Sequence, residues 1–97
     1  MKTFVILRRN GWRSGEELAE AAERSRQVGD EEMSEDIRWI RSYVLGEGAG
    51  VGTVCIYQAT SEEKVREHAQ RAGLPADEVV EVLDTVLVRP DPEPAAA

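Results

Sequence analysis

The sequence predicts an α+β fold in which strands and helices follow in the order β-α-β-β-α-β, with both helices on one face of an antiparallel sheet. Helix-start signatures occur at Ser14–Glu17 and at Thr60–Glu63, and β-prone apolar segments precede and follow each of them. The two segments between the helices are joined only by the glycine-rich stretch 46–50, so we expect them to pair as antiparallel neighbours. This element order is the split βαβ arrangement of ferredoxin-like folds.

The first half of the chain supplies one strand and one helix. Residues 2–8 form a short β-prone run, and Asn10–Gly11 closes it with turn-forming residues. The hydroxyl of Ser14 and the carboxylate of Glu17 match a capping box, which satisfies backbone N–H groups at a helix start. Apolar residues then recur at helical spacing, and we expect Gly29 to end the helix.

The two middle strands alternate with a period of two. Residues 37–45 and 51–59 are apolar on both sides, which is typical of strands that are covered on both faces. One predicted face gathers the candidate ligand-binding residues, which are Trp39, Arg41, Tyr43, Cys55 and Tyr57, together with Thr53. Aromatic and arginine side chains are common both in protein interfaces and in pocket walls, so this face predicts either a dimer contact or a ligand cavity.

The rest of the chain completes the sheet. Thr60–Glu63 caps a second helix, and Gly73 ends it. Residues 79–88 are rich in β-branched side chains and predict the last strand, with a break near Asp84–Thr85 as the alternative. The Pro- and Ala-rich residues 90–97 have too little to bury and predict a disordered tail.

Residues 1–89 are therefore expected to form one ferredoxin-like domain, which leaves one face of its sheet without helices. A chain of this length buries only about 60–70% of its unfolded surface, so a partner surface adds stability. We expect the cover to be a second copy of the same sheet in two-fold symmetry. The result would be a homodimer that resembles a dimeric α+β barrel.

The charge of the chain argues against several classes of partner. The 97 residues carry a formal net charge of −7 and a pI near 4.7, which disfavours binding to nucleic acids and to anionic membranes. A single cysteine cannot form an internal disulfide, and the apolar start ends too early for a signal peptide, so we expect a cytoplasmic protein. Arg8, Arg9 and Arg13 form a basic cluster that either binds a small anion or pairs with the acids of the first helix.

Three segments resemble a known family, namely Trp39–Val44, Cys55–Ala59 and Arg66–Asp77. Together they resemble the small ferredoxin-like domain-of-unknown-function family that is named after a nickel-binding protein, and the resemblance extends over residues 1–89. The resemblance implies a dimer of ferredoxin-like subunits that binds nickel at its surface and serves in metal sequestration. It thereby implies a divalent metal such as nickel as the cofactor.

The metal that the resemblance implies would find few ligands in this chain. Arg8, Arg9 and Arg41 stand where the resemblance implies histidines, and arginine has no lone pair to give to a metal. His68 is the only histidine and is therefore the candidate metal ligand, with Glu67 as a further donor. The alternative is a half-buried histidine that packs between its helix and the sheet.

These observations predict a homodimeric protein that binds a small ligand or a metal, and we expect binding rather than catalysis. One alternative is a cofactor-free enzyme of the dimeric α+β-barrel type, and another is a purely structural interaction module. The cavity of such an enzyme would be lined by Arg41, Tyr43, Cys55, Tyr57 and His68. Cys55 is either a small buried hydrophobe or a reactive thiolate beside Arg41. The pattern leaves open whether Cys55 and His68 lie on the same side of the sheet.

Overall fold

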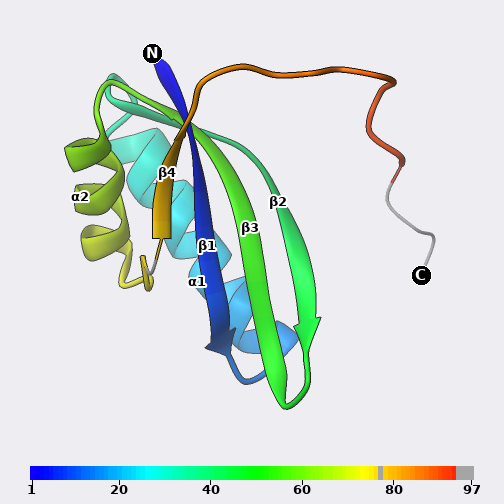
Figure 1. Ribbon diagram of the computed structural model, residues 1–97. Helices are drawn as coiled ribbons and strands as arrows, with labels where there is room; N and C mark the ends of the chain where they lie inside the picture. Colours follow the sequence, from blue (N-terminus) through cyan, green and yellow to red (C-terminus); the bar gives the residue numbers. More distant parts are fainter. Residues whose placement is uncertain (77, 94–97) are drawn as a thin grey trace.

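The computed structural model describes residues 1–76 and 78–93. Figure 1 shows both helices on the same side of one twisted sheet, with a C-terminal segment that leads away from the last strand. Among the described residues, no helix has the length and apolar character needed to cross a membrane. The elements are β1 (Lys2–Trp12), α1 (Gly15–Gln27), the π-helical turn η1 (Val28–Glu32), β2 (Ile37–Glu47), β3 (Gly50–Ala59), α2 (Glu62–Ala72) and β4 (Glu78–Val82).

The four strands form one antiparallel sheet in the order β2-β3-β1-β4. β3 pairs with β1 on one side and with β2 on the other, and β4 pairs with the free side of β1. Because β1 and β2 are both antiparallel to β3, they run parallel to each other with β3 between them, which is the split βαβ arrangement. The ferredoxin-like α+β fold predicted from the sequence is confirmed.

Both helices begin at the predicted caps. The Ser14 hydroxyl accepts a hydrogen bond of 3.3 Å from the backbone N–H of Glu17, while the Glu17 carboxylate accepts one of 3.0 Å from the backbone N–H of Arg13. Ser61 caps α2 in the same way, and Gly73 ends α2 in the left-handed conformation at φ 69°. These caps satisfy backbone groups that the helices themselves leave unpaired.

α1 ends at Gln27, two residues before the expected stop at Gly29, but the helical winding does not stop there. The helical winding continues through η1, and the backbone N–H of Met33 donates to the carbonyl of Val28 over 3.0 Å. Val28 and Met33 are both buried and join the core, so packing against the sheet outweighs the low helix propensity of glycine.

The core lies between the helices and one face of the sheet. Phe4 and Ile6 of β1 lie opposite Tyr57 and Cys55 of β3, and all four side chains are buried together with Val65 of α2. Since side chains alternate along a strand, the neighbours Val54 and Ile56 point to the other face. Cys55 and the buried His68 of α2 therefore lie on the same side of the sheet, which answers the question that the sequence pattern left open.

β2 contains a β-bulge at Ile40. Trp39 lies opposite Tyr57, but Arg41 lies opposite Ile56, so Ile40 is an extra residue without a partner on β3. A bulge of this kind exchanges the two faces for every later residue of its strand.

The bulge corrects the prediction that the candidate residues share one face. Trp39, Cys55 and Tyr57 face the helices, whereas Arg41 and Tyr43 lie at positions that face the other side of the sheet. The sequence pattern continued a period of two through residue 40, and nothing in that pattern indicates the extra residue.

The face without helices is apolar. This open face consists of Val5 and Leu7 on β1, Tyr43 on β2, Val54 and Ile56 on β3, and Val80 on β4. Tyr43 is 45% exposed and Val80 51% exposed, and the remaining members are half-buried. No helix of the described chain covers them.

The last strand is shorter than the predicted 79–88, because β4 ends at Val82. Near the predicted break, the Asp84 carboxylate accepts the backbone N–H of Thr85 over 2.8 Å, a local bond that competes with strand pairing. Of the predicted tail 90–97, residues 90–93 have no regular structure and residues 94–97 lie outside the described residues.

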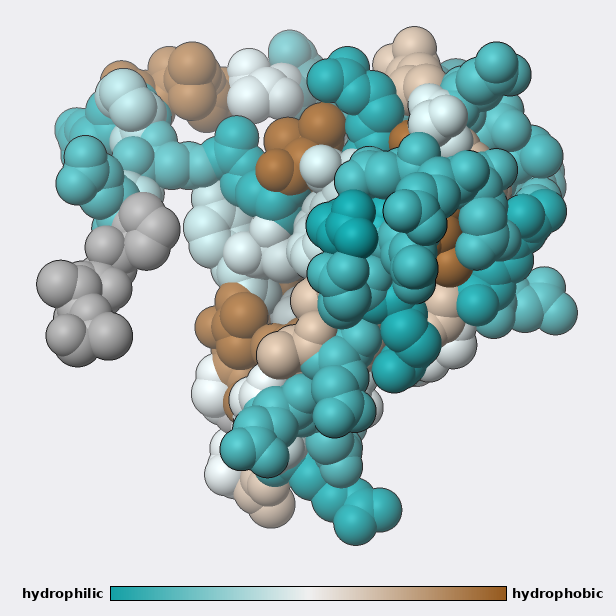
Figure 2. Space-filling model, turned by 180° about the vertical axis from the view of Figure 1, so that it is seen from behind, coloured by the Kyte–Doolittle hydropathy of each residue, from teal (hydrophilic) through white to brown (hydrophobic). Residues whose placement is uncertain are grey.

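Residues 83–93, which we call the C-terminal arm, expose several apolar side chains. Leu83 and Val86 are each 89% exposed, Leu87 is 79% exposed and Val88 is 76% exposed. Figure 2 shows hydrophobic residues along the part of the arm that leads to the grey C-terminal end. Asp91 of the arm pairs with Arg41 of β2.

Candidate ligand-binding cavity

A cavity of about 410 Å³ lies between α1 and the helix-covered face of the sheet. This volume is in the range of small-molecule sites, roughly 300–1,000 Å³. Its apolar walls include Trp12 of β1, Leu18 and Ala22 of α1, and Trp39 and Val44 of β2. Its buried polar lining consists of Arg8, Ser25, Thr53, Cys55 and Tyr57.

Arg8 is a buried cation that pairs with no carboxylate in the described part of the chain. Its side chain is 1% exposed, because Arg8 continues the inward alternation of Phe4 and Ile6 along β1. Nε donates to the carbonyl of Pro75 over 2.5 Å, and Nη1 donates to the Cys55 sulfur over 3.1 Å. Nη2 has no hydrogen-bond partner among the described residues.

The Cys55 thiol belongs to the same polar group. It accepts the hydrogen bond from Arg8, and it donates its own hydrogen to the Thr53 hydroxyl over 3.3 Å. Cys55 is 4% exposed and is a free cysteine. The cation beside this thiol is Arg8, and not Arg41 as the sequence reading proposed.

Tyr57 lies at the centre of the buried aromatic residues. Its ring stacks on Trp39 at a centroid distance of 6.2 Å and contacts the His68 ring at 5.3 Å, while the Arg8 Cζ lies 6.0 Å from its centroid. Its hydroxyl shares a hydrogen bond of 3.0 Å with the Ser25 hydroxyl. Burial raises the pKa of Tyr57, and the opposing effects of Arg8 and Ser25 are smaller. The phenol is therefore neutral near pH 7.

His68 is buried next to Tyr57 and is held as a neutral ring. Its Nε2 lies 2.9 Å from the carbonyl of Ser25, and because a carbonyl only accepts, Nε2 carries the hydrogen. Nδ1 then has a lone pair, and it has no partner in the described part of the chain. Burial lowers the pKa of His68, the hydrogen bond to Ser25 opposes that shift, and the charge of Arg8 lowers the pKa further.

Comparison with known proteins places this fold in a family. Residues 4–82 match the family described as nickel responsive protein SCO4226-like. The chain belongs to this family. The crystal structure of SCO4226 from Streptomyces coelicolor A3(2) is similar to it, with a TM-score of 0.70 and 22% sequence identity over 87% of this chain and 99% of that chain. At this identity the similarity shows the shared fold alone, and no curated protein sequence matches the chain.

Membership of the SCO4226-like family confirms the resemblance found in the sequence, but the donor set for nickel is poor in this member. Within residues 1–76 and 78–93, no three His, Cys, Asp or Glu side chains gather where they could hold a metal ion. The Nε2 of His68 is bonded to Ser25 and the Cys55 sulfur is bonded to Arg8 and Thr53, so the buried Nδ1 of His68 is left as a single free donor of this pair. A divalent ion needs several free donors around one point, so these residues do not fit it.

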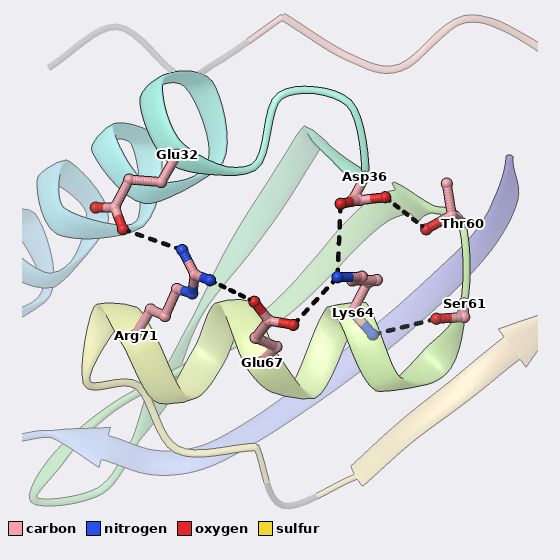
Figure 3. A network of polar contacts seen from close by, with 7 residues as sticks. All are labelled: Glu32, Asp36, Thr60, Ser61, Lys64, Glu67 and Arg71. Carbon is pink, nitrogen blue, oxygen red and sulfur yellow. Dashed lines mark hydrogen bonds and ion pairs between the residues drawn. The ribbon is translucent and has the colours of Figure 1, made fainter.

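Glu67, the predicted further donor, belongs to a surface network of ion pairs (Figure 3). Its carboxylate lies between Lys64 at 3.3 Å and Arg71 at 2.7 Å. Lys64 also reaches Asp36, and Arg71 reaches Glu32, so the network ties α2 to η1 and to the residue before β2. Two cations therefore compete with any metal for this carboxylate.

The structure brings together part of the predicted site. Trp39, Cys55 and Tyr57 line the cavity. His68 lies behind this wall and contacts the Tyr57 ring. Arg41 borders the cavity near the bulge, but its guanidinium pairs with Asp91 of the arm. Tyr43 lies on the open face, away from this cavity.

The sequence reading missed Ser25 as a site residue and misplaced Arg8. The sequence indicates burial at both positions. Arg8 follows Phe4 and Ile6 at the two-residue spacing of one strand face, and Ser25 lies four residues after Ala21 on the buried face of the helix. Arg8 was grouped instead with Arg9 and Arg13, which are exposed.

We predict that His68→Gln removes a pH-dependent contribution to stability. The folded state disfavours protonated His68, so the neutral ring makes its full contribution to stability above the unfolded pKa of about 6.5. As the pH falls below this value, the free energy of unfolding decreases by up to about 1.4 kcal/mol per pH unit. Glutamine keeps an N–H donor for Ser25 but does not titrate. Urea unfolding of both proteins should show that the stability difference between them decreases from about pH 7.5 to 5.5, because only the wild type has the titrating ring. The carboxylates titrate equally in both proteins and cancel in the comparison. Parallel profiles would contradict a buried neutral His68.

Proposed function

We propose that this chain is a small-molecule-binding protein whose ligand occupies the cavity between α1 and the sheet. The observation that carries the proposal is Arg8, which is 1% exposed, lines the cavity and has an Nη2 without a partner among the described residues. A buried donor without a partner costs about 1–3 kcal/mol, and more when it is charged. A ligand that accepts from Nη2 removes this cost, which provides a driving force for binding.

The composition of the walls supports the same proposal. Apolar side chains such as Trp12, Leu18 and Val44 supply the hydrophobic contact, while Arg8 and the hydroxyl pair of Ser25 and Tyr57 supply a few directed polar groups. Mostly apolar walls with a small number of polar groups are the usual design of a small-molecule site.

We prefer binding to catalysis because the titratable groups are already engaged. Tyr57 and His68 each form a hydrogen bond with Ser25, through its hydroxyl and its carbonyl respectively. A cofactor-free enzyme would need one of them to exchange a proton with the ligand. Their pKa values are shifted away from neutrality, upward for Tyr57 and downward for His68, which opposes that role.

Filling the cavity should weaken binding. Ala22 of α1 lines the cavity, and Ala22→Leu places additional carbon atoms in it, whereas Ala19→Leu is a matched change at an exposed position of the same helix. With the fluorescent anion 1-anilinonaphthalene-8-sulfonate as the probe, we expect Ala22→Leu to raise Kd about tenfold or more, equivalent to about 1.4 kcal/mol. Ala19→Leu should bind as the wild type does. Equal affinities in all three proteins would place the probe elsewhere and overturn the proposed cavity.

His68 should not determine nickel affinity. Its Nε2 is occupied by Ser25, its Nδ1 lone pair is buried, and the described residues around it do not gather into a set of ligands. We therefore expect isothermal titration calorimetry with Ni²⁺ to give the same weak binding, through surface carboxylates, for the wild type and for His68→Gln. Loss of a stoichiometric site in the variant alone would establish His68 as a nickel ligand.

We also infer that a second copy of this chain covers the open face. The chain exposes 6621 Å², whereas a compact monomer of 10.8 kDa exposes roughly 5,500 Å². This additional exposed surface is of the same order as the area that one partner buries in a standard interface, about 800 Å². Val86, Leu87 and Val88 of the arm border a cleft that the open-face residues Val5, Tyr43 and Ile56 also line, so a second copy placed by a two-fold axis would meet one apolar surface made of both.

Two adjacent residues of β2 provide a matched test of this interface. Tyr43 belongs to the open face, while Val44 points to the other side, and they are 45% and 59% exposed. We expect sedimentation velocity at micromolar concentration to give a dimer for the wild type and for Val44→Asp. Tyr43→Asp should give a monomer, because it places a charge in the apolar contact. A monomeric wild type would rule out the second copy as the cover.

A further inference from the structure

The geometry points to a small organic monocarboxylate as the ligand of the cavity, with its carboxylate on the Arg8 guanidinium and its apolar body between α1 and β2. This inference rests on the proposed function and specifies the ligand of that same site.

The charge of Arg8 is the first argument. Arginine stays protonated in proteins, and the groups that accept from Arg8, which are the Pro75 carbonyl, the Cys55 sulfur and more weakly the Tyr57 hydroxyl, are neutral. No carboxylate of the described residues forms an ion pair with Arg8. A buried charge without a counter-ion costs several kcal/mol, so an anion gains more from this position than a neutral ligand of the same shape.

The available donors are the second argument. Both N–H groups of Nη2 lack a partner in the described chain. The hydroxyls of Ser25 and Tyr57 have two hydrogens between them and use one for their mutual bond, so one hydroxyl hydrogen is left over. Ser25 and Tyr57 both line the cavity with Arg8. The site thus offers one cation and one neutral donor, which suits the two oxygens of a single carboxylate.

The number of charges distinguishes a carboxylate from a phosphate ester and from a metal. Arg8 is the only buried cation among the described residues, so a phosphate dianion would retain an unbalanced charge in the cavity. A divalent cation would be repelled by Arg8. The apolar walls, formed in part by Trp12, Leu18 and Val44, require that the rest of the ligand be hydrophobic.

Benzoate and benzamide form a matched pair of probes that differ mainly in charge. Titration calorimetry of the wild type should give benzoate at least tenfold tighter binding than benzamide, and phenyl phosphate weaker binding than benzoate. Arg8→Met keeps a side chain of similar length without the charge, and it should bind the two probes equally. Arg9→Met, at an exposed neighbouring position, should keep the wild-type preference.

The free protein gives a second readout that a merely structural arginine would not produce. If Arg8 is an uncompensated charge, Arg8→Met should raise the Tm of the free protein and abolish the stabilisation by benzoate. If wild-type protein binds benzoate and benzamide equally, the carboxylate inference is overturned while the cavity remains a binding site. If neither these probes nor the naphthalene sulfonate bind in the cavity, the proposed function itself is overturned.

Discussion

The burial of one arginine is the constraint on which the helix-covered side of this molecule depends. Arg8 ends the inward series of β1, and it is surrounded by a carbonyl, a thiol and an aromatic ring, while no carboxylate of residues 1–76 and 78–93 forms an ion pair with it. A core of this size would gain stability from an aliphatic residue at the same position. The arrangement therefore costs folding free energy in the free protein, and such a cost is typical of sites whose partner is a ligand and not the protein itself.

The bulge at Ile40 sets the shape of the site around this arginine. By exchanging the faces of β2, it turns Arg41 and Tyr43 toward the open face and turns Ser42 and Val44 inward. Had the alternation continued unbroken, Arg41 would point at the helix-covered side and place a second cation near Arg8. The bulge thus leaves Arg8 as the buried cation of the cavity, while Arg41 stands at the border of the cavity and pairs with Asp91 of the arm.

The parts of the fold that depend on local chemistry could be predicted from the sequence. Ser14, Ser61 and Gly73 act where their capping chemistry predicts, and the hairpin between β2 and β3 follows from its glycines. The bulge at Ile40 could not be predicted, because an extra residue changes pairing without changing composition or hydrophobic pattern. The π-helical turn η1, which continues the winding from the end of α1 through Gly29, was missed for a similar reason, since tertiary packing of Val28 and Met33 decides it.

The nickel responsiveness in the description of the family and the anionic ligand that we propose differ in charge, and the side chains of this chain are the basis of the proposal. A nickel site needs lone pairs, and in this chain the sequence resemblance places Arg8 and Arg41 where it implies histidines. A guanidinium has no lone pair for a metal and carries a permanent positive charge, so arginine at these positions disfavours a metal cation and favours an anion. His68 remains, but as a neutral ring bonded to Ser25 it orders the cavity wall instead of presenting a free ligand set. A shared fold and family can therefore coexist with a different ligand class, because the scaffold is fixed by the core and the ligand by a few side chains.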